Sequence, residues 1–154
     1  MEINEKNKLV KNARETAEGY FRRGEYFCSE AVLTTINDAL GQELPSEIVK
    51  MASGFPIGIG KSGCLCGAVS GGVMSLGLAY GRTKPNGDMP KSFSNNAALH
   101  DYIIEEYGST CCRALTSGFV EFDSPERAEH CIQITGEVAA WVMKNFIENG
   151  VVEE

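Results

Sequence analysis

The chain has 154 residues, enough for one domain that folds without help from a metal or disulfide framework. Its formal net charge of −7 argues against general binding of nucleic acid or of an anionic membrane surface, because both repel an acidic protein. No apolar run approaches the length of about 20 residues that crosses a bilayer, and the N-terminal residues lack the apolar core of a secretory signal. We therefore expect a cytoplasmic protein that is not embedded in a membrane, and we treat residues 1–154 as one domain.

Hydrophobic periodicity predicts an all-α fold of six or seven helices, because apolar residues recur at three- and four-residue spacing and strand-like alternation is absent. The first helix carries Leu9 and Tyr20 and stops at Gly24, and Ser124 caps the last and longest helix. The other helices are expected from about 27 to 40, from 45 to before 54, from 66 to 80, from 94 to 107 and around 112–115, and the last runs from 125 to 150.

Glycine is concentrated between Gly54 and Gly81, where nine of the 17 glycines fall. Residues 54–63 are predicted to form a loop, and the helix that follows contains four internal glycines, each costing about 1 kcal/mol relative to alanine. Such a helix is understandable if another helix backbone, a cofactor or a disulfide partner presses against it. Gly67 and Gly71 are accordingly candidates for cofactor contact.

Two glycine motifs resemble nucleotide-binding loops, but we interpret both as an ordinary flexible loop. Residues 58–63 match the dinucleotide pattern GxGxxG, yet the preceding segment is predicted as helix rather than strand. The phosphate-loop pattern fails because Phe55 stands where it needs glycine. The two histidines, His100 and His130, lie in no recognisable hydrolase context, so a hydrolase has no support.

Cysteine chemistry is the other unusual feature of the sequence. In a reducing compartment, six cysteines indicate metal or redox chemistry more often than a static disulfide framework, although single free cysteines are commonly just small buried hydrophobes. No CxxC motif is present, so a shared site must be assembled by folding, with separate helices each delivering one sulfur. The cysteines are Cys28, Cys64, Cys66, Cys111, Cys112 and Cys131.

Cys66 is predicted to be the most reactive thiol of the cofactor-free protein. It stands at the start of the glycine-rich helix, where unpaired N–H groups and the helix dipole favour a thiolate, and Lys61 in the preceding loop adds positive charge. Burial in apolar surroundings would shift its pKa in the opposite direction.

Several segments resemble the C-GCAxxG-C-C family of redox-active proteins, and the resemblance covers nearly the whole chain. Residues 66–71 read Cys-Gly-Ala-Val-Ser-Gly, residues 28–33 read Cys-Ser-Glu-Ala-Val-Leu, and residues 108–113 read Gly-Ser-Thr-Cys-Cys-Arg. The family name places Gly before the second Cys, whereas this chain has Cys followed by Gly. The resemblance implies four family cysteines with catalytic or metal-ligating roles, namely Cys28, Cys66, Cys112 and Cys131. Cys64 and Cys111 are additional to that set and are kept as candidates for cofactor contact.

The resemblance implies a redox role of a kind found largely in anaerobic prokaryotes, often near transport or electron-transfer genes. The chain is also similar to the helical part of split-Soret cytochromes, which holds an iron–sulfur cluster through cysteines. A Cys-x-x-Cys-His motif is absent, so covalent c-type haem is not expected.

Three hypotheses remain open from the sequence. The cysteines hold an iron–sulfur cluster in an electron carrier, or they perform thiol–disulfide chemistry without a cofactor in an oxidoreductase, or the protein is a structural zinc or packing module that binds a membrane transporter. A redox protein or a transporter is the expected partner, and a homo-oligomer is compatible with each hypothesis.

Overall fold

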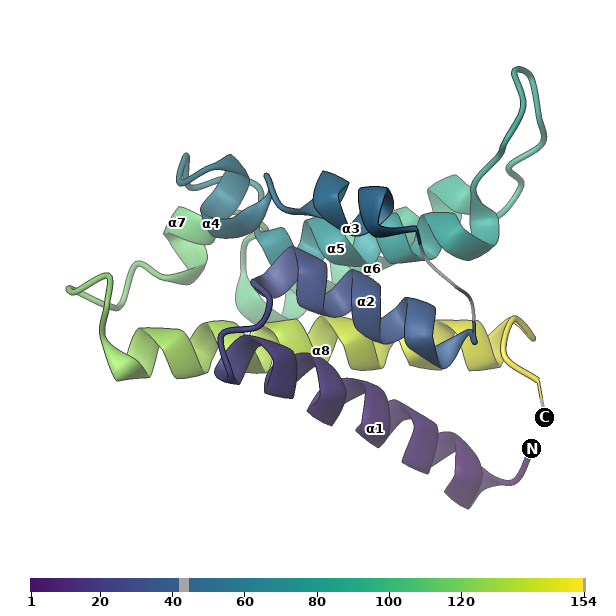
Figure 1. The fold of residues 1–154 in the computed structure, drawn as a ribbon, viewed down its shortest axis with the longest axis horizontal. Coiled ribbons are helices and arrows are strands. Elements are labelled where there is room, and N and C mark those ends of the chain that lie inside the picture. The colour runs from purple at the N-terminus through teal and green to yellow at the C-terminus, as the bar shows by residue number, and fades with distance from the viewer. Residues whose placement is uncertain (42–44, 154) are drawn as a thin grey trace.

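The computed structural model describes residues 1–41 and 45–153, and every regular element in these ranges is a helix (Figure 1). The all-α prediction is therefore confirmed. None of the described helices is both long and apolar enough to cross a membrane. The elements in chain order are α1 (Ile3–Arg22), α2 (Cys28–Ala39), α3 (Ser46–Ala52), α4 (Pro56–Ile59), α5 (Gly67–Tyr80), α6 (Ser92–Tyr107), α7 (Cys112–Leu115) and α8 (Pro125–Glu148).

Local sequence signals account for where these helices begin and end. Gly24 follows α1 with φ of +70°, a left-handed conformation that glycine adopts without strain. The hydroxyl of Ser124 accepts a hydrogen bond of 3.2 Å from the Arg127 backbone N–H at the start of α8, and Pro125 occupies the first helical position. Seven of the eight helices in residues 1–41 and 45–153 correspond to the predicted ones.

The helix that was not predicted, α4, is a single turn within the segment expected to be a loop. Its inner residues Ile57 and Gly58 have φ of 58° and 65°, so the backbone winds in the left-handed sense there. A Cβ on Gly58 would overlap the backbone of Gly63 and Cys64, because the loop folds closely onto itself. Periodicity could not predict this turn, since it depends on contacts within the loop.

The larger helices pack around α8. The N-terminal helix α1 lies along α8, α2 lies against α1, α5 and α8, and α6 covers the other side of α5 (Figure 1). The core side chains come from all of the longer helices, and the largest that are fully buried include Leu33, Ile36, Leu76, Leu99, Ile103, Val138 and Phe146.

The glycines of α5 allow this helix to approach its neighbours closely. A Cβ on Gly71 would lie 2.6 Å from the Ser29 carbonyl oxygen of α2, and one on Gly72 would lie 2.7 Å from side-chain carbons of Leu99 and Val138. Close helix packing therefore explains Gly71 and Gly72, whereas a Cβ on Gly77 would meet nothing within 4 Å.

Candidate functional site

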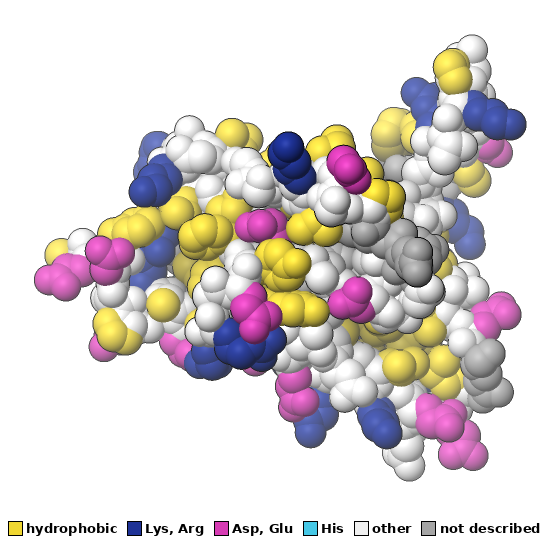
Figure 2. All heavy atoms as spheres, in the orientation of Figure 1, with side chains coloured by type: hydrophobic (Ala, Val, Ile, Leu, Met, Phe, Trp, Pro, Cys, Tyr) yellow, Lys and Arg dark blue, Asp and Glu magenta, His cyan; other side chains and the backbone are white. Residues whose placement is uncertain are grey.

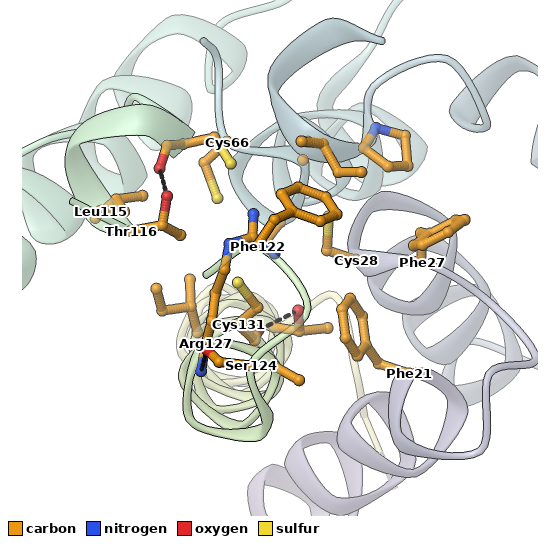
Figure 3. Close-up of a pocket in the computed structure, with 18 of the residues that line it drawn as sticks. Phe21, Phe27, Cys28, Cys66, Leu115, Thr116, Phe122, Ser124, Arg127 and Cys131 are labelled. Atoms are coloured by element: carbon orange, nitrogen blue, oxygen red, sulfur yellow. Dashed lines mark hydrogen bonds between the residues drawn. The ribbon is translucent and has the colours of Figure 1, made fainter. Parts of the chain in front are cut away.

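Four free cysteines line one cavity of about 270 Å³ at the end of the bundle where α4 and α7 lie (Figure 1, Figure 3). Cys28 is the first residue of α2, Cys66 immediately precedes α5, and Cys112 is the first residue of α7. Cys131 lies in the second turn of α8. The fold thus gathers, from four helices, the four cysteines that the family resemblance indicated.

The rest of the cavity wall is mainly apolar. Aromatic rings and aliphatic side chains surround the sulfurs, and Arg127 and Asp123 are the charged residues of the lining. The guanidinium carbon of Arg127 lies 4.2 Å from the ring centroid of Phe122 (Figure 3). The apolar part of the wall consists of Phe21, Phe27, Pro56, Ile57, Ala68, Leu115, Phe122, Ala128 and Ile134 together with Gly67.

Gly67 makes room for the sulfur of Cys28 at the start of α5. A Cβ on this residue would overlap the sulfur of Cys28 and would lie 3.2 Å from the Cα of Pro56. The absence of a side chain therefore lets the Cys28 sulfur rest against the start of α5, next to Cys66. Gly71, the other glycine predicted to contact a cofactor, does not line the cavity and packs against α2 instead.

Burial dominates the acidity of these thiols. Desolvation raises the pKa of Cys66 to about 11, although the backbone amides of Val69 and Ala68 favour its thiolate. The pKa of Cys28 is raised more strongly, chiefly by burial, and burial also raises the pKa of Cys131 against the opposing charge of Arg127. The lowered pKa predicted for Cys66 is therefore wrong, because the helix start lies inside an apolar wall.

The four thiols also interact with one another electrostatically. A negative charge on Cys66, Cys112 or Cys131 raises the pKa of Cys28, and charges on Cys112 and Cys131 raise that of Cys66. Several thiolates can consequently form together only if a nearby cation compensates their charge.

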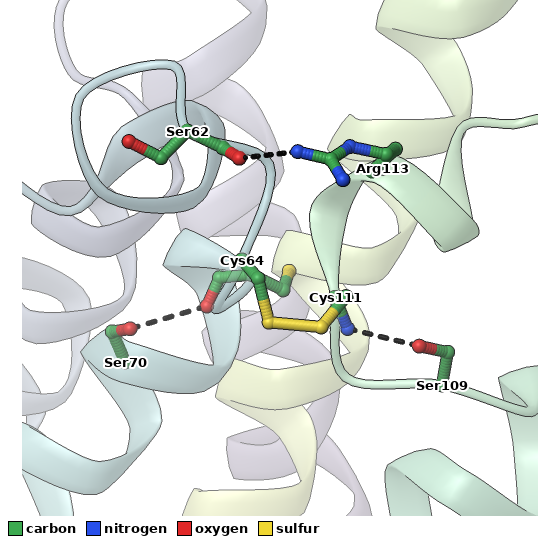
Figure 4. The surroundings of a disulfide bond; sticks show 7 residues. Ser62, Cys64, Ser70, Ser109, Cys111 and Arg113 are labelled. Carbon is green, nitrogen blue, oxygen red and sulfur yellow. Dashed lines mark hydrogen bonds between the residues drawn. A yellow bond between two sulfur atoms is a disulfide. The ribbon is translucent and has the colours of Figure 1, made fainter.

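Cys64 and Cys111 form a disulfide beside the cavity rather than part of its wall (Figure 4). Backbone hydrogen bonds on either side of the disulfide also join the segment that carries Cys64 to the segment that carries Cys111. The Cys66 N–H donates to the Thr110 carbonyl at 2.7 Å, and the Arg113 N–H donates to the Gly63 carbonyl at 2.8 Å.

The disulfide revises two expectations drawn from the sequence. Cys64 and Cys111 were predicted to contact a cofactor, but each is bonded to the other and neither lines the cavity. Metal or redox chemistry was also expected in preference to a disulfide, and the structure contains one disulfide together with four free cysteines. By bonding the segments that precede α5 and α7, the disulfide helps to position Cys66 and Cys112.

No three His, Cys, Asp or Glu side chains in the described residues are close enough to hold a single metal ion. The two histidines lie outside the cavity wall. The Nε2 atom of His130 is 2.9 Å from the Leu115 carbonyl oxygen, and His100 contacts Asp101.

Sequence reasoning missed Arg127 as a site residue. It lies four residues before Cys131 on α8, and residues at that spacing share one helix face. Ser124 and Pro125 predict where this helix begins, and the four-residue spacing could then have placed Arg127 on the same helix face as Cys131.

Comparison with known families supports the resemblance noted in the sequence. The model of the family described as "Putative redox-active protein (C_GCAxxG_C_C)" matches residues 26–145, a span that includes all six cysteines. Comparisons with curated proteins and with solved structures gave no match. The match covers more than half of the chain, and the chain therefore belongs to the C-GCAxxG-C-C family of redox-active proteins.

Proposed function

We propose that Cys28, Cys66, Cys112 and Cys131 together hold an iron–sulfur cluster and that the protein is an electron carrier. The observation that supports this function is the arrangement of the four free thiols around one cavity. Four cysteine thiolates are the usual ligand set of such clusters, which accept and donate single electrons.

The acidity of the thiols favours ligation over nucleophilic chemistry. A thiol that attacks a disulfide must be ionised, and with a pKa of about 11 Cys66 is almost wholly protonated near neutral pH. A metal centre supplies the positive charge that makes deprotonation of buried thiols favourable. Raised pKa values in the cofactor-free protein are thus compatible with ligands and unfavourable for a nucleophile.

The spread of the sulfurs favours a cluster over a single zinc ion. Zinc binds sulfur at about 2.3 Å, so its ligands must crowd around one point, and the described thiols do not do so. A cluster contains several iron and sulfide atoms, so its ligands can stand farther apart. The backbone amides of Ala68 and Val69, which already favour the Cys66 thiolate, are available to tune the potential of such a group.

The test is anaerobic reconstitution of the protein with ferrous iron and sulfide, followed by iron and sulfide counts, visible absorption and electron paramagnetic resonance of the reduced sample. Serine at any one of the four cavity cysteines should strongly reduce bound iron. The matched control is the double variant Cys64→Ser/Cys111→Ser, which removes two sulfurs outside the cavity. It should retain iron, because the backbone hydrogen bonds from Cys66 to Thr110 and from Arg113 to Gly63 still join the two segments. Circular dichroism verifies that each variant is folded.

Two results would overturn the proposal. Zinc bound in preference to iron, with no visible chromophore, would indicate a structural metal role. Failure to bind any metal, combined with reversible pairwise oxidation of the cavity thiols, would indicate thiol–disulfide chemistry.

A further inference from the structure

We propose that a cationic pocket beside the thiol cavity binds the anionic group, a carboxylate or a phosphate, of a small molecule that reaches the thiols. The cationic pocket has a volume of about 480 Å³, and its charged residues are Lys61, Arg113 and Arg127, with no carboxylate in the lining. Such a concentration of positive charge is notable in a chain whose net charge is −7. The role of the bound molecule at the thiols rests on the proposed function, whereas its binding to the cationic pocket is independent of that function.

The three cations have unused capacity to bind an anion. None of them forms an ion pair within residues 1–41 and 45–153, whereas Arg14, Arg22 and Arg23 each have a carboxylate partner. The Nη2 group of Arg113 donates to the Ser62 carbonyl at 2.9 Å (Figure 4). This bond orients the guanidinium and leaves its other donors available.

An aromatic ring holds the other two cations in place. The Nζ atom of Lys61 lies 5.9 Å from the Phe122 ring centroid, and Arg127 lies over the same ring. These contacts retain the positive charges, which can still pair with an incoming oxyanion. Dark blue basic side chains lie next to yellow apolar ones at the α4 and α7 end of the molecule (Figure 2).

The two pockets adjoin each other at Cys112. Ile57, Cys112, Thr116, Phe122 and Arg127 line both of them. A molecule anchored by its anionic group at Lys61 and Arg113 can therefore extend past Cys112 into the apolar cavity. The ligand class that fits is a small molecule with one oxyanion group and an apolar body, rather than a neutral or cationic molecule.

The first test compares two alkylating reagents of similar size in the cofactor-free protein: anionic iodoacetate and neutral iodoacetamide. The rate at Cys112 is measured by mass spectrometry of its peptide, and the rate ratio of the two reagents is normalised to that of N-acetylcysteine. Nearby unpaired cations should raise the normalised ratio roughly three- to tenfold at low ionic strength, and added salt should reduce it.

Matched variants separate local charge from net charge. Lys61→Gln/Arg113→Gln should abolish the preference for iodoacetate, and because the preference is a ratio of two rates at the same thiol, a change in the ionisation of Cys112 does not affect it. Lys84→Gln/Lys91→Gln is the control, because it also removes two positive charges and both exposed lysines lie in the segment between α5 and α6, at the opposite end of the molecule (Figure 1). A normalised ratio near one in the wild type, or an equal loss in the control, would overturn the inference.

A second readout does not depend on the reactivity of Cys112. Inorganic phosphate, compared with sodium chloride at equal ionic strength, should raise the melting temperature of the wild type but not of Lys61→Gln/Arg113→Gln. An equal shift in both proteins would also overturn the inference. If a cluster forms without any anion preference, only this inference fails. If the preference is present but no cluster forms, only the proposed function fails.

Discussion

Replacing Gly71 by alanine should destabilise the protein, although alanine is the better helix former. An added Cβ would lie 2.6 Å from the carbonyl oxygen and 2.9 Å from the Cα of Ser29, closer than real Cβ atoms approach. Both neighbours are backbone atoms of α2, so they cannot rotate away. The two helices would have to move apart or shift along each other.

Gly77→Ala is the matched comparison in the same helix, because a Cβ there would meet nothing within 4 Å. Alanine should gain about 1 kcal/mol of helix propensity at either position. Overpacking typically costs about 1–3 kcal/mol, and the rigid backbone contact at Gly71 places that variant at the upper end. We therefore expect Gly71→Ala to unfold more easily than wild type by about 1–2 kcal/mol.

Urea denaturation followed by circular dichroism measures the free energy of unfolding of both variants. Gly77→Ala should be more stable than wild type by up to about 1 kcal/mol. Because α2 carries Cys28 and α5 follows Cys66, Gly71→Ala should also reduce the iron bound after reconstitution. A Gly71→Ala variant as stable as Gly77→Ala would refute the close-packing explanation of the glycine-rich helix.

The remaining predictions concern the thiols and one half-buried carboxylate. Gly67→Ala should displace the Cys28 sulfur and lower the iron content without loss of helicity, while Gly77→Ala retains iron; equal iron in both would contradict the steric argument. Alkylation of Cys66 by iodoacetamide should accelerate about tenfold per pH unit between about pH 7 and 10, because its pKa is about 11, and a plateau below pH 9 would show that burial does not control it. Burial raises the pKa of Glu137, but hydrogen bonds from Tyr102 and Arg14 outweigh this effect and hold the pKa below its usual value of 4.5. The resulting stabilisation is present above pH 4.5 and is lost as the pH falls through the lower folded-state pKa. Glu137→Gln should therefore lower the free energy of unfolding by about 1 kcal/mol at neutral pH and leave it unchanged near pH 2, as measured by thermal unfolding. An equal loss of stability at both pH values would show that the ionisation of Glu137 does not contribute.

The sequence by itself was sufficient for the local structure of every described helix except α4. Helical spacing and terminal signals such as Gly24, Ser124 and Pro125 are properties of neighbouring residues, so seven helices could be predicted with little error. The resemblance of short motifs identified Cys28, Cys66, Cys112 and Cys131 as a set before their positions in space were known.

Only the tertiary structure decided how the cysteines divide and how they ionise. Cys64 and Cys111 are 47 residues apart, and their pairing follows from loop contacts that no periodicity encodes. Cys66 does occupy the predicted helix start, yet its pKa is raised, because the walls that bury it come from distant parts of the chain. A helix terminus is a local feature, whereas desolvation is the sum of all surrounding groups, and in this cavity desolvation is the larger effect.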